Sequence, residues 1–149
     1  MLDPYKGGLF SINPYAAKRE IKGRLVVILR GKLENRRLSL VIPISRAVLK
    51  NDIHELIITD EAEAGPGKAV NSISYAGFVE ITEGGVLVAG DEVVCNGKVL
   101  GRVAGFDETH LPNHLNIVIF SGSRNDGVEL GLALESEISF RIKRDGDDQ

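Results

Sequence analysis

The sequence contains no tryptophan and only one cysteine, Cys95, among its 149 residues. A single cysteine excludes a framework of internal disulfides. The longest aliphatic run, Leu25–Leu29, is far shorter than the roughly 20 apolar residues of a membrane-spanning helix, so we expect no membrane association. The first residues contain no apolar stretch typical of a secretory signal. We therefore expect a cytoplasmic protein.

Aromatic side chains are scarce, at 5% of the residues, and none lies in the basic segment Arg30–Arg37. Proteins that bind single-stranded nucleic acids interleave cations with aromatic rings on which the bases stack. The net charge of the chain is −3, which is also unfavourable for binding a polyanion. We therefore expect no nucleic-acid partner.

The charges are unevenly divided along the chain. Residues 1–50 contain 11 Lys/Arg and 3 Asp/Glu, a balance of +8, whereas residues 51–149 contain 7 and 18, a balance of −11. Such asymmetry indicates an anion-binding face, complementary surfaces between subunits, or two halves whose charges intermix in one folded domain. Because a basic hairpin can dock on the acidic face of a second copy, we expect a homo-oligomer.

Short runs of β-branched residues, bounded by Gly, Pro, Asn or Ser, follow one another from Gly23 onward. This pattern is typical of an all-β fold. We predict a small single-domain β-barrel or two-sheet sandwich of about seven to nine strands over residues 21–144. An irregular N-terminal arm over residues 1–20, with three regularly spaced aromatic side chains, and a frayed acidic tail over residues 145–149 complete the predicted organisation.

The best-defined unit is a hairpin over Asp91–Phe106. Its Asn96-Gly97 pair is typical of a type I′ turn, in which both central residues need a positive φ. Gly101 and Gly105 interrupt the return strand and predict a β-bulge or a close approach of the backbone. One helical turn is expected over Ser45–Asn51, with a serine as N-cap. The other expected strands are Arg24–Arg30, Arg37–Ile44, Ile53–Thr59, Leu115–Phe120, Val128–Leu134 and Ser136–Lys143.

The segment with the most polar side chains, Asp107–Asn116, follows this hairpin and contains two of the three histidines, His110 and His114. Pro112 disfavours a helix here, so the spacing does not place both imidazoles on one helical face. Loops that rigid strands present are where binding and catalytic side chains gather. We therefore take this segment as the candidate site.

Three interpretations of this loop are open. Either histidine is a general base oriented by Asp107 or Glu108; the imidazoles and one of these carboxylates bind a divalent metal ion; or Asp107 only caps a turn. The neighbouring amides, Asn113 and Asn116, orient a ligand or close an Asx turn. Because two histidines without a cysteine partner are a weak metal signal, we predict no metal site and no cofactor.

Further candidate residues suit an anion. Ser121, Ser123 and Arg124 follow a buried strand and offer hydroxyls and a guanidinium to a phosphate or carboxylate. Lys68 ends a Gly-Pro loop that lacks the first glycine and the Ser/Thr of a phosphate-binding P-loop, yet such a loop can close over an anionic ligand. A small anionic ligand is therefore the expected partner.

A Gly90-Asp91 turn, the strand end Val103–Gly105 and the later Phe120-Ser-Gly122 resemble the C-terminal half of the glucitol/sorbitol-specific IIA components of the bacterial phosphotransferase system. When Phe120-Ser-Gly122 is aligned, the histidine of that family falls on Leu115, one position from His114. The resemblance implies a small β-barrel and a phosphocarrier, in which a histidine is transiently phosphorylated.

No complete catalytic set is evident, because the chain offers an acid–base candidate without a nucleophile or a cofactor motif. We therefore predict a ligand-binding or accessory module whose site is a mouth formed by Asp107–His114 together with Ser121–Arg124. The alternatives are a small enzyme that uses His110 or His114 as the acid–base group, and the phosphocarrier.

Overall fold

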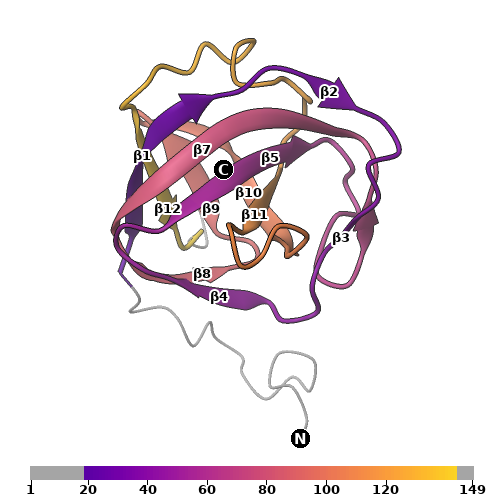
Figure 1. The fold of residues 1–149 in the computed structure, drawn as a ribbon, viewed down its shortest axis with the longest axis horizontal. Helices are drawn as coiled ribbons and strands as arrows, with labels where there is room; N and C mark the ends of the chain where they lie inside the picture. Colours follow the sequence, from indigo (N-terminus) through magenta and orange to yellow (C-terminus); the bar gives the residue numbers. More distant parts are fainter. Residues whose placement is uncertain (1–18, 144–149) are drawn as a thin grey trace, which may run out of the picture.

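In the computed structural model, which describes residues 19–143, the chain forms twelve β-strands and no helix (Figure 1). The predicted all-β class is therefore confirmed. The N-terminal arm, apart from Arg19 and Glu20, and the acidic tail lie outside the described residues. Within residues 19–143 there is also no helix long and apolar enough to cross a membrane.

Seven strands form a closed ring in the order β1, β12, β9, β10, β11, β5, β7 and back to β1. Neighbours are antiparallel except for β11 and β5, which run parallel. Closure leaves the ring without a free edge, which is how barrels avoid edge-to-edge association. The strands are β1 Ile21–Ile28, β5 Ile53–Thr59, β7 Ile73–Glu83, β9 Glu92–Cys95, β10 Lys98–Asp107, β11 Asn116–Phe120 and β12 Glu137–Arg141.

Five short strands lie beside the ring. Strand β2 (Lys32–Leu33) pairs antiparallel with the start of β7, and β3 (Leu38–Ser39) pairs with β6 (Ala69–Val70). Strand β4 (Ser45–Val48) pairs with β8 (Gly85–Val88) in a two-stranded ribbon, drawn at the lower end of the ring in Figure 1.

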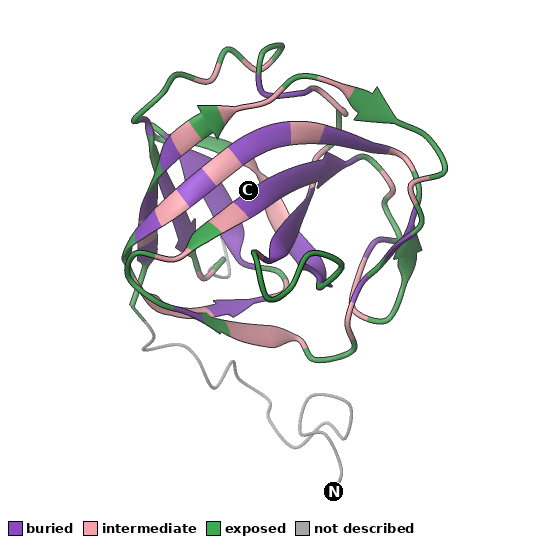
Figure 2. Ribbon diagram, viewed as in Figure 1, coloured by how far each residue is buried: buried purple, intermediate pink, exposed green. Residues whose placement is uncertain are grey.

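The main hydrophobic core fills the inside of the ring. Along β12 and β11 the inward residues are fully buried, and the two largest core side chains, Phe106 and Phe140, are 0% exposed. Figure 2 shows the buried residues concentrated on the strands of the ring and the exposed ones on the connections. The interior of the ring is therefore packed with apolar side chains.

A second, smaller core lies on the outer face of β5, β10 and β11. Ile57, Ala104 and Val118 of these strands pack there against Leu38 and Leu40. We call the segment around Leu38 and Leu40, which packs over this face, the outer cover. A backbone hydrogen bond holds it in place, because the amide of Leu40 donates to the carbonyl of Lys68 (2.9 Å). This cover shields the middle of β11 from solvent.

The predicted Asp91–Phe106 hairpin is confirmed in detail. Asn96 and Gly97 have φ values of 49° and 84°, as a type I′ turn requires. The register shifts between Val99 and Gly101 and again between Val103 and Gly105, so each interrupting glycine lies at a bulge.

Three local predictions are wrong. Ser45–Asn51 does not form a helical turn, because Ser45–Val48 pairs in full with β8. Only Leu38–Ser39 of the strand predicted over Arg37–Ile44 forms, and Arg37 itself has a φ of 56°. Val128–Leu134 is a set of turns instead of a strand, since the Asp126 side chain accepts from the Glu129 amide (2.8 Å) and Gly131 has a φ of 70°.

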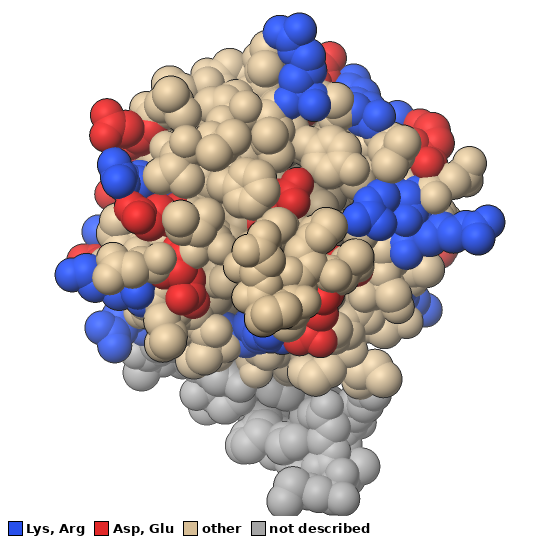
Figure 3. All heavy atoms as spheres, viewed as in Figure 1, with Lys and Arg blue, Asp and Glu red and all other residues tan. Residues whose placement is uncertain are grey.

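Positive and negative side chains intermix on the folded surface. On the face shown in Figure 3, Lys/Arg and Asp/Glu lie next to one another around the rim, and the centre is mostly uncharged. Arg24 of β1, for example, contacts Glu80 and Glu135 at 2.9 and 3.1 Å. Some residues of the basic first third are thus neutralised by the acidic remainder within one chain.

Candidate functional site

Four side chains form a row across the outer face of the ring at the start of β11. The register pairs Asp107 of β10 with Asn116 of β11, Asn116 with Glu55 of β5, and Glu55 with Phe78 of β7. Because directly paired residues point to the same side of a sheet, all four side chains lie on one face. Asp107, Asn116 and Glu55 are buried, at 2%, 1% and 7% exposure.

The loop Glu108–Leu115 connects β10 to β11 beside this row and appears orange in Figure 1. It is built of turns, in which the amides of Asn113 and His114 donate to the carbonyl of His110 at 2.8 and 3.3 Å. The loop is not helical, as the sequence predicted from Pro112. These turns bring the two histidine rings together, with centroids 4.9 Å apart.

His114 contacts a carboxylate that the sequence did not single out. Its Nε2 lies 3.2 Å from Oε1 of Glu55, and the two side chains are only 13% and 9% exposed. The ring of Phe78 packs edge-on against the imidazole, with centroids 5.1 Å apart. Glu55, His110 and His114 each offer one ligand atom, and these atoms lie within 4.8 Å of one another. We call these three residues the histidine–glutamate cluster.

Asp107 has a structural role in this arrangement. Its Oδ1 accepts hydrogen bonds from the Thr109 amide and from Nδ2 of Asn116, both at 3.0 Å, and its Oδ2 accepts from the Ser39 amide at 3.3 Å. The carboxylate thus joins the loop, β11 and the outer cover. It contacts neither histidine.

The other predicted residues of the loop are divided between surface and interior. Glu108 is exposed and forms an ion pair with Arg46 of β4. Nδ2 of Asn113 lies 3.5 Å from Nδ1 of His114. Asn116 Oδ1 is buried and has no hydrogen-bond partner within residues 19–143.

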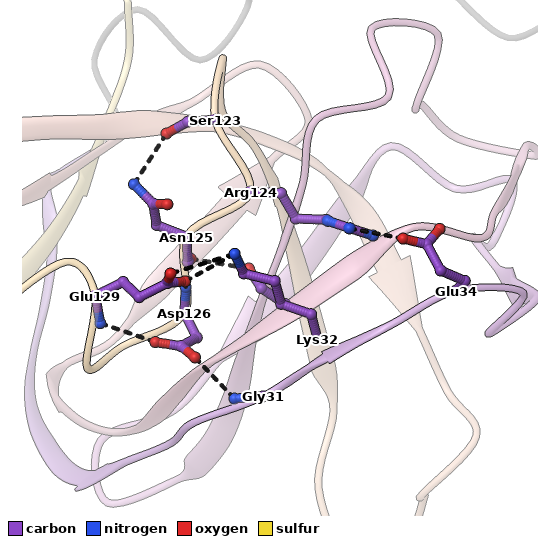
Figure 4. Close-up of polar contacts among 9 residues, drawn as sticks. Gly31, Lys32, Glu34, Ser123, Arg124, Asn125, Asp126 and Glu129 are labelled. Atoms are coloured by element: carbon purple, nitrogen blue, oxygen red, sulfur yellow. Dashed lines mark hydrogen bonds and ion pairs between the residues drawn. The ribbon is translucent and has the colours of Figure 1, made fainter.

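The predicted mouth does not form, because its two halves lie at opposite ends of β11. Ser121 follows Phe120, and a strand of five residues separates the two ends by roughly 16 Å at about 3.3 Å per residue. Ser123 accepts a hydrogen bond from Asn125, and Arg124 contacts Glu34 at 2.7 Å (Figure 4). Lys68 is exposed in the loop before β6.

The Arg124 guanidinium is paired within the protein through Nη2, which contacts Glu34, whereas its buried Nη1 has no hydrogen-bond partner within residues 19–143. The hydrogen bond from Arg124 lowers the pKa of the Glu34 carboxyl, and the same contact raises the pKa of Arg124. The neighbouring contacts in Figure 4 are also internal: Lys32 forms an ion pair with Glu129 at 3.0 Å, and Asp126 accepts a hydrogen bond from the Gly31 amide at 2.9 Å. These contacts therefore form a polar network that holds the 123–129 turns on the ring.

The third histidine, His54, is held in its neutral form. Its Nδ1 accepts a hydrogen bond from the Leu115 amide at 3.2 Å, so the proton of the neutral ring is on Nε2, which faces Asp52 at 3.3 Å. Burial is the main cause that lowers the pKa of His54 below its usual 6.5, and the charges of Arg46 and His114 lower it further, against the opposing effect of Asp52.

This lowered pKa predicts a loss of stability in mild acid. Below pH 6.5 the unfolded chain binds a proton at His54 that the folded chain does not bind until the pH reaches its lower folded-state pKa. The contribution of neutral His54 to the free energy of unfolding is therefore complete above pH 6.5. It decreases as the pH falls from 6.5 toward the folded-state pKa. Urea unfolding at pH 8, 7, 6 and 5 is expected to show a steeper decline for the wild type than for His54→Gln. Parallel curves would contradict this assignment.

The sequence pattern indicated the two loop histidines but not Glu55. One signal was present: Glu55 is an acidic residue directly before the apolar run Leu56–Ile58 of a buried strand. A charge at such a position needs a partner, because an unpaired buried charge is strongly unfavourable. The identity of that partner depends on the pairing of β5 with β11, for which the local sequence gives no signal.

Comparison with known proteins gives a family without an assigned activity. No curated protein and no solved structure matches the chain at a significant level. The family described as "Family of unknown function (DUF6917)" matches residues 15–141, which include the whole ring and the histidine–glutamate cluster. The chain therefore belongs to the DUF6917 family.

Proposed function

We propose that this protein is a binding module whose ligand is a divalent transition-metal ion, held by the histidine–glutamate cluster. The observation that carries the proposal is the convergence of three ligand atoms within 4.8 Å. In a tetrahedral zinc site with bonds of 2.0–2.1 Å, neighbouring ligand atoms are about 3.3 Å apart. His114 Nε2 and Glu55 Oε1, at 3.2 Å, already have this separation, so only His110 on the exposed loop needs to move.

The surroundings of the cluster also favour a cation. Glu55 is a buried carboxylate, and among the described residues its side chain has a polar contact with the imidazole of His114. Next to it in register, Asn116 has a buried carbonyl oxygen to which no described residue donates a hydrogen bond. A positive ion would compensate the Glu55 charge and offer the Asn116 oxygen a direct or water-mediated partner.

The ligand set indicates the class of metal. Two imidazoles and one carboxylate suit Zn²⁺ and its transition-metal neighbours, whereas Ca²⁺ and Mg²⁺ prefer sites made only of oxygen. Because His110 is exposed, a fourth position stays open to water, as in zinc sites with two histidines and one glutamate. We therefore replace the sequence-based prediction of no metal with this proposal.

Metal binding requires one tautomer of His114. Its Nε2 must be free of a proton, which places the proton on Nδ1, opposite the Asn113 amide. The oxygen and nitrogen of such an amide are assigned from their hydrogen bonds, and rotation by 180° turns Oδ1 toward Nδ1. Asn113 would then accept the Nδ1 proton and orient the ring, as neighbouring groups of metal-binding histidines commonly do.

Titration calorimetry of the chelator-treated protein with Zn²⁺ at pH 7.5 tests the proposal. We expect one equivalent to bind with a dissociation constant on the order of 1 μM or lower. His114→Ala is expected to weaken binding on the order of 100-fold and Glu55→Gln at least about 10-fold, because each removes a ligand. Glu137→Gln is the matched control, since it removes the charge of an exposed glutamate on β12, outside the cluster, and it should bind like the wild type.

Three results would decide against a metal site. They are an absence of binding at micromolar Zn²⁺, equal affinity of wild type and His114→Ala, and equal binding of Mg²⁺. Affinity for Zn²⁺ should also be lower in acid, because protons compete with the metal for its ligand atoms.

A second candidate function is acid–base catalysis by His114 and Glu55, which the buried 3.2 Å contact favours. Here Glu55 takes the orienting role that the sequence suggested for Asp107 or Glu108. Such an enzyme would keep its activity after chelator treatment, which separates it from a metal-dependent site. The homo-oligomeric state, the cytoplasmic location and the phosphocarrier alternative remain predictions from the sequence.

A further inference from the structure

A second row of side chains crosses the outer face of the ring at the far end of β11. The register pairs Arg141 of β12 with Glu92 of β9, Glu92 with Arg102 of β10, and Arg102 with Phe120 of β11. All four side chains therefore lie on one face. An open groove of about 280 Å³ lies along this row, and Val99, Leu100, Arg102, Phe120, Ser121 and Lys143 are among the residues that line it.

The two arginines of the row have different partners. Arg141 donates through Nε and Nη2 to Oε1 of Glu92, at 2.9 and 2.8 Å, so the Glu92 charge is compensated. The Arg102 guanidinium instead lies over the Phe120 ring, 4.7 Å from its centroid. Within residues 19–143 it forms no ion pair or hydrogen bond. Stacking fixes the plane of a guanidinium and leaves its N–H donors at the edge available.

We propose that this groove binds a small aromatic carboxylate. The carboxylate would meet the free edge of Arg102, which suits two-point recognition of a planar anion. The formal charge of the row is +1, because Arg102 and Arg141 together outnumber Glu92.

The rest of the groove suits a flat apolar group. Val99 is 48% exposed, and together with Leu100 and Phe120 it gives the groove an apolar floor. The volume is near the lower limit of ligand pockets, about 300 Å³, and so fits one or two aromatic rings. The sequence pointed to a small anion near Ser121, but the structure offers Arg102 there and pairs Arg124 with Glu34.

The site is independent of the histidine–glutamate cluster, since the covered middle of β11 lies between them. The test therefore uses chelator-treated full-length protein and calorimetric titration with 2-naphthoate. We expect one molecule to bind, with acetate and inorganic phosphate at least about 10-fold weaker because they lack the apolar contact. Arg102→Gln and Val99→Glu are each expected to weaken binding at least about 10-fold.

Two control variants show whether a loss of 2-naphthoate binding is specific to the groove. Arg30→Gln removes an exposed arginine outside the groove, and His114→Ala alters the other site, so both should bind 2-naphthoate like the wild type. Thermal unfolding of each variant shows whether it is folded. Absence of 2-naphthoate binding, equal binding by Arg102→Gln, or tighter binding of phenyl phosphate or acetate than of 2-naphthoate would each overturn the proposal.

Discussion

Replacing Asp107 with Ala is expected to lower the free energy of unfolding by about 3 kcal/mol. Asp107 is 2% exposed, and its two oxygens accept hydrogen bonds from Asn116, Thr109 and Ser39. The largest part of the loss comes from Asn116, which is 1% exposed and would be left with a buried amide without an acceptor. Urea unfolding at pH 7.5 measures the change.

Asp107→Asn is the control for this prediction. Two of the three hydrogen bonds use Oδ1, which an asparagine retains, so the variant loses only the 3.3 Å contact to Ser39 and about 1 kcal/mol. Equal destabilisation by the two substitutions would contradict the role given to Oδ1. Asp107→Ala should in addition weaken Zn²⁺ binding about 10-fold although Asp107 is no ligand, because it positions the loop that carries His110.

Replacing Gly127 with Ala is expected to destabilise the protein by about 3 kcal/mol or more. A Cβ at this position would lie 2.0 Å from the Ala76 carbonyl oxygen and 2.9 Å from that of Leu29. Both contacts are with backbone, so the 123–129 turns must move away from β7 and from the end of β1. The same movement disturbs the 3.0 Å hydrogen bond from the Gly127 amide to the Tyr75 carbonyl.

Gly122→Ala is the matched control, because no atom lies within 4 Å of a Cβ built there. It is expected to change stability by less than about 0.5 kcal/mol. Thermal and urea unfolding of the two variants give the comparison. A Gly127→Ala protein as stable as Gly122→Ala would show that the backbone contact at Gly127 does not restrict the fold.

Local chemistry predicted the parts of the structure that depend on neighbours in sequence. The Asn96-Gly97 pair determined the turn of the β9–β10 hairpin, and the interrupting glycines marked its bulges. The apolar run of β11 likewise predicted a strand buried on both faces. Within the candidate site, the loop and its two histidines were predicted because they are close together in the sequence.

Contacts that depend on strands distant in sequence could not be predicted in this way. Glu55 meets His114 only because β5 and β11 pair in parallel, and no turn connects two parallel neighbours directly. Ser45–Asn51 carried a helix-cap signal, but pairing with β8 determined its structure. Arg124 matched the pattern of an anion-binding turn, yet its Nη2 pairs with Glu34, a residue 90 positions earlier in the chain.

Closure of the ring has a consequence for synthesis on the ribosome. Strand β1 is the first described strand to be made, and it pairs on one side with β7 and on the other with β12, the last. Until β12 has left the ribosome, β1 and β9 each keep an unpaired edge that exposes backbone donors and acceptors. Nascent chains that stop before Glu137 should therefore be the species most prone to aggregate and to require chaperones.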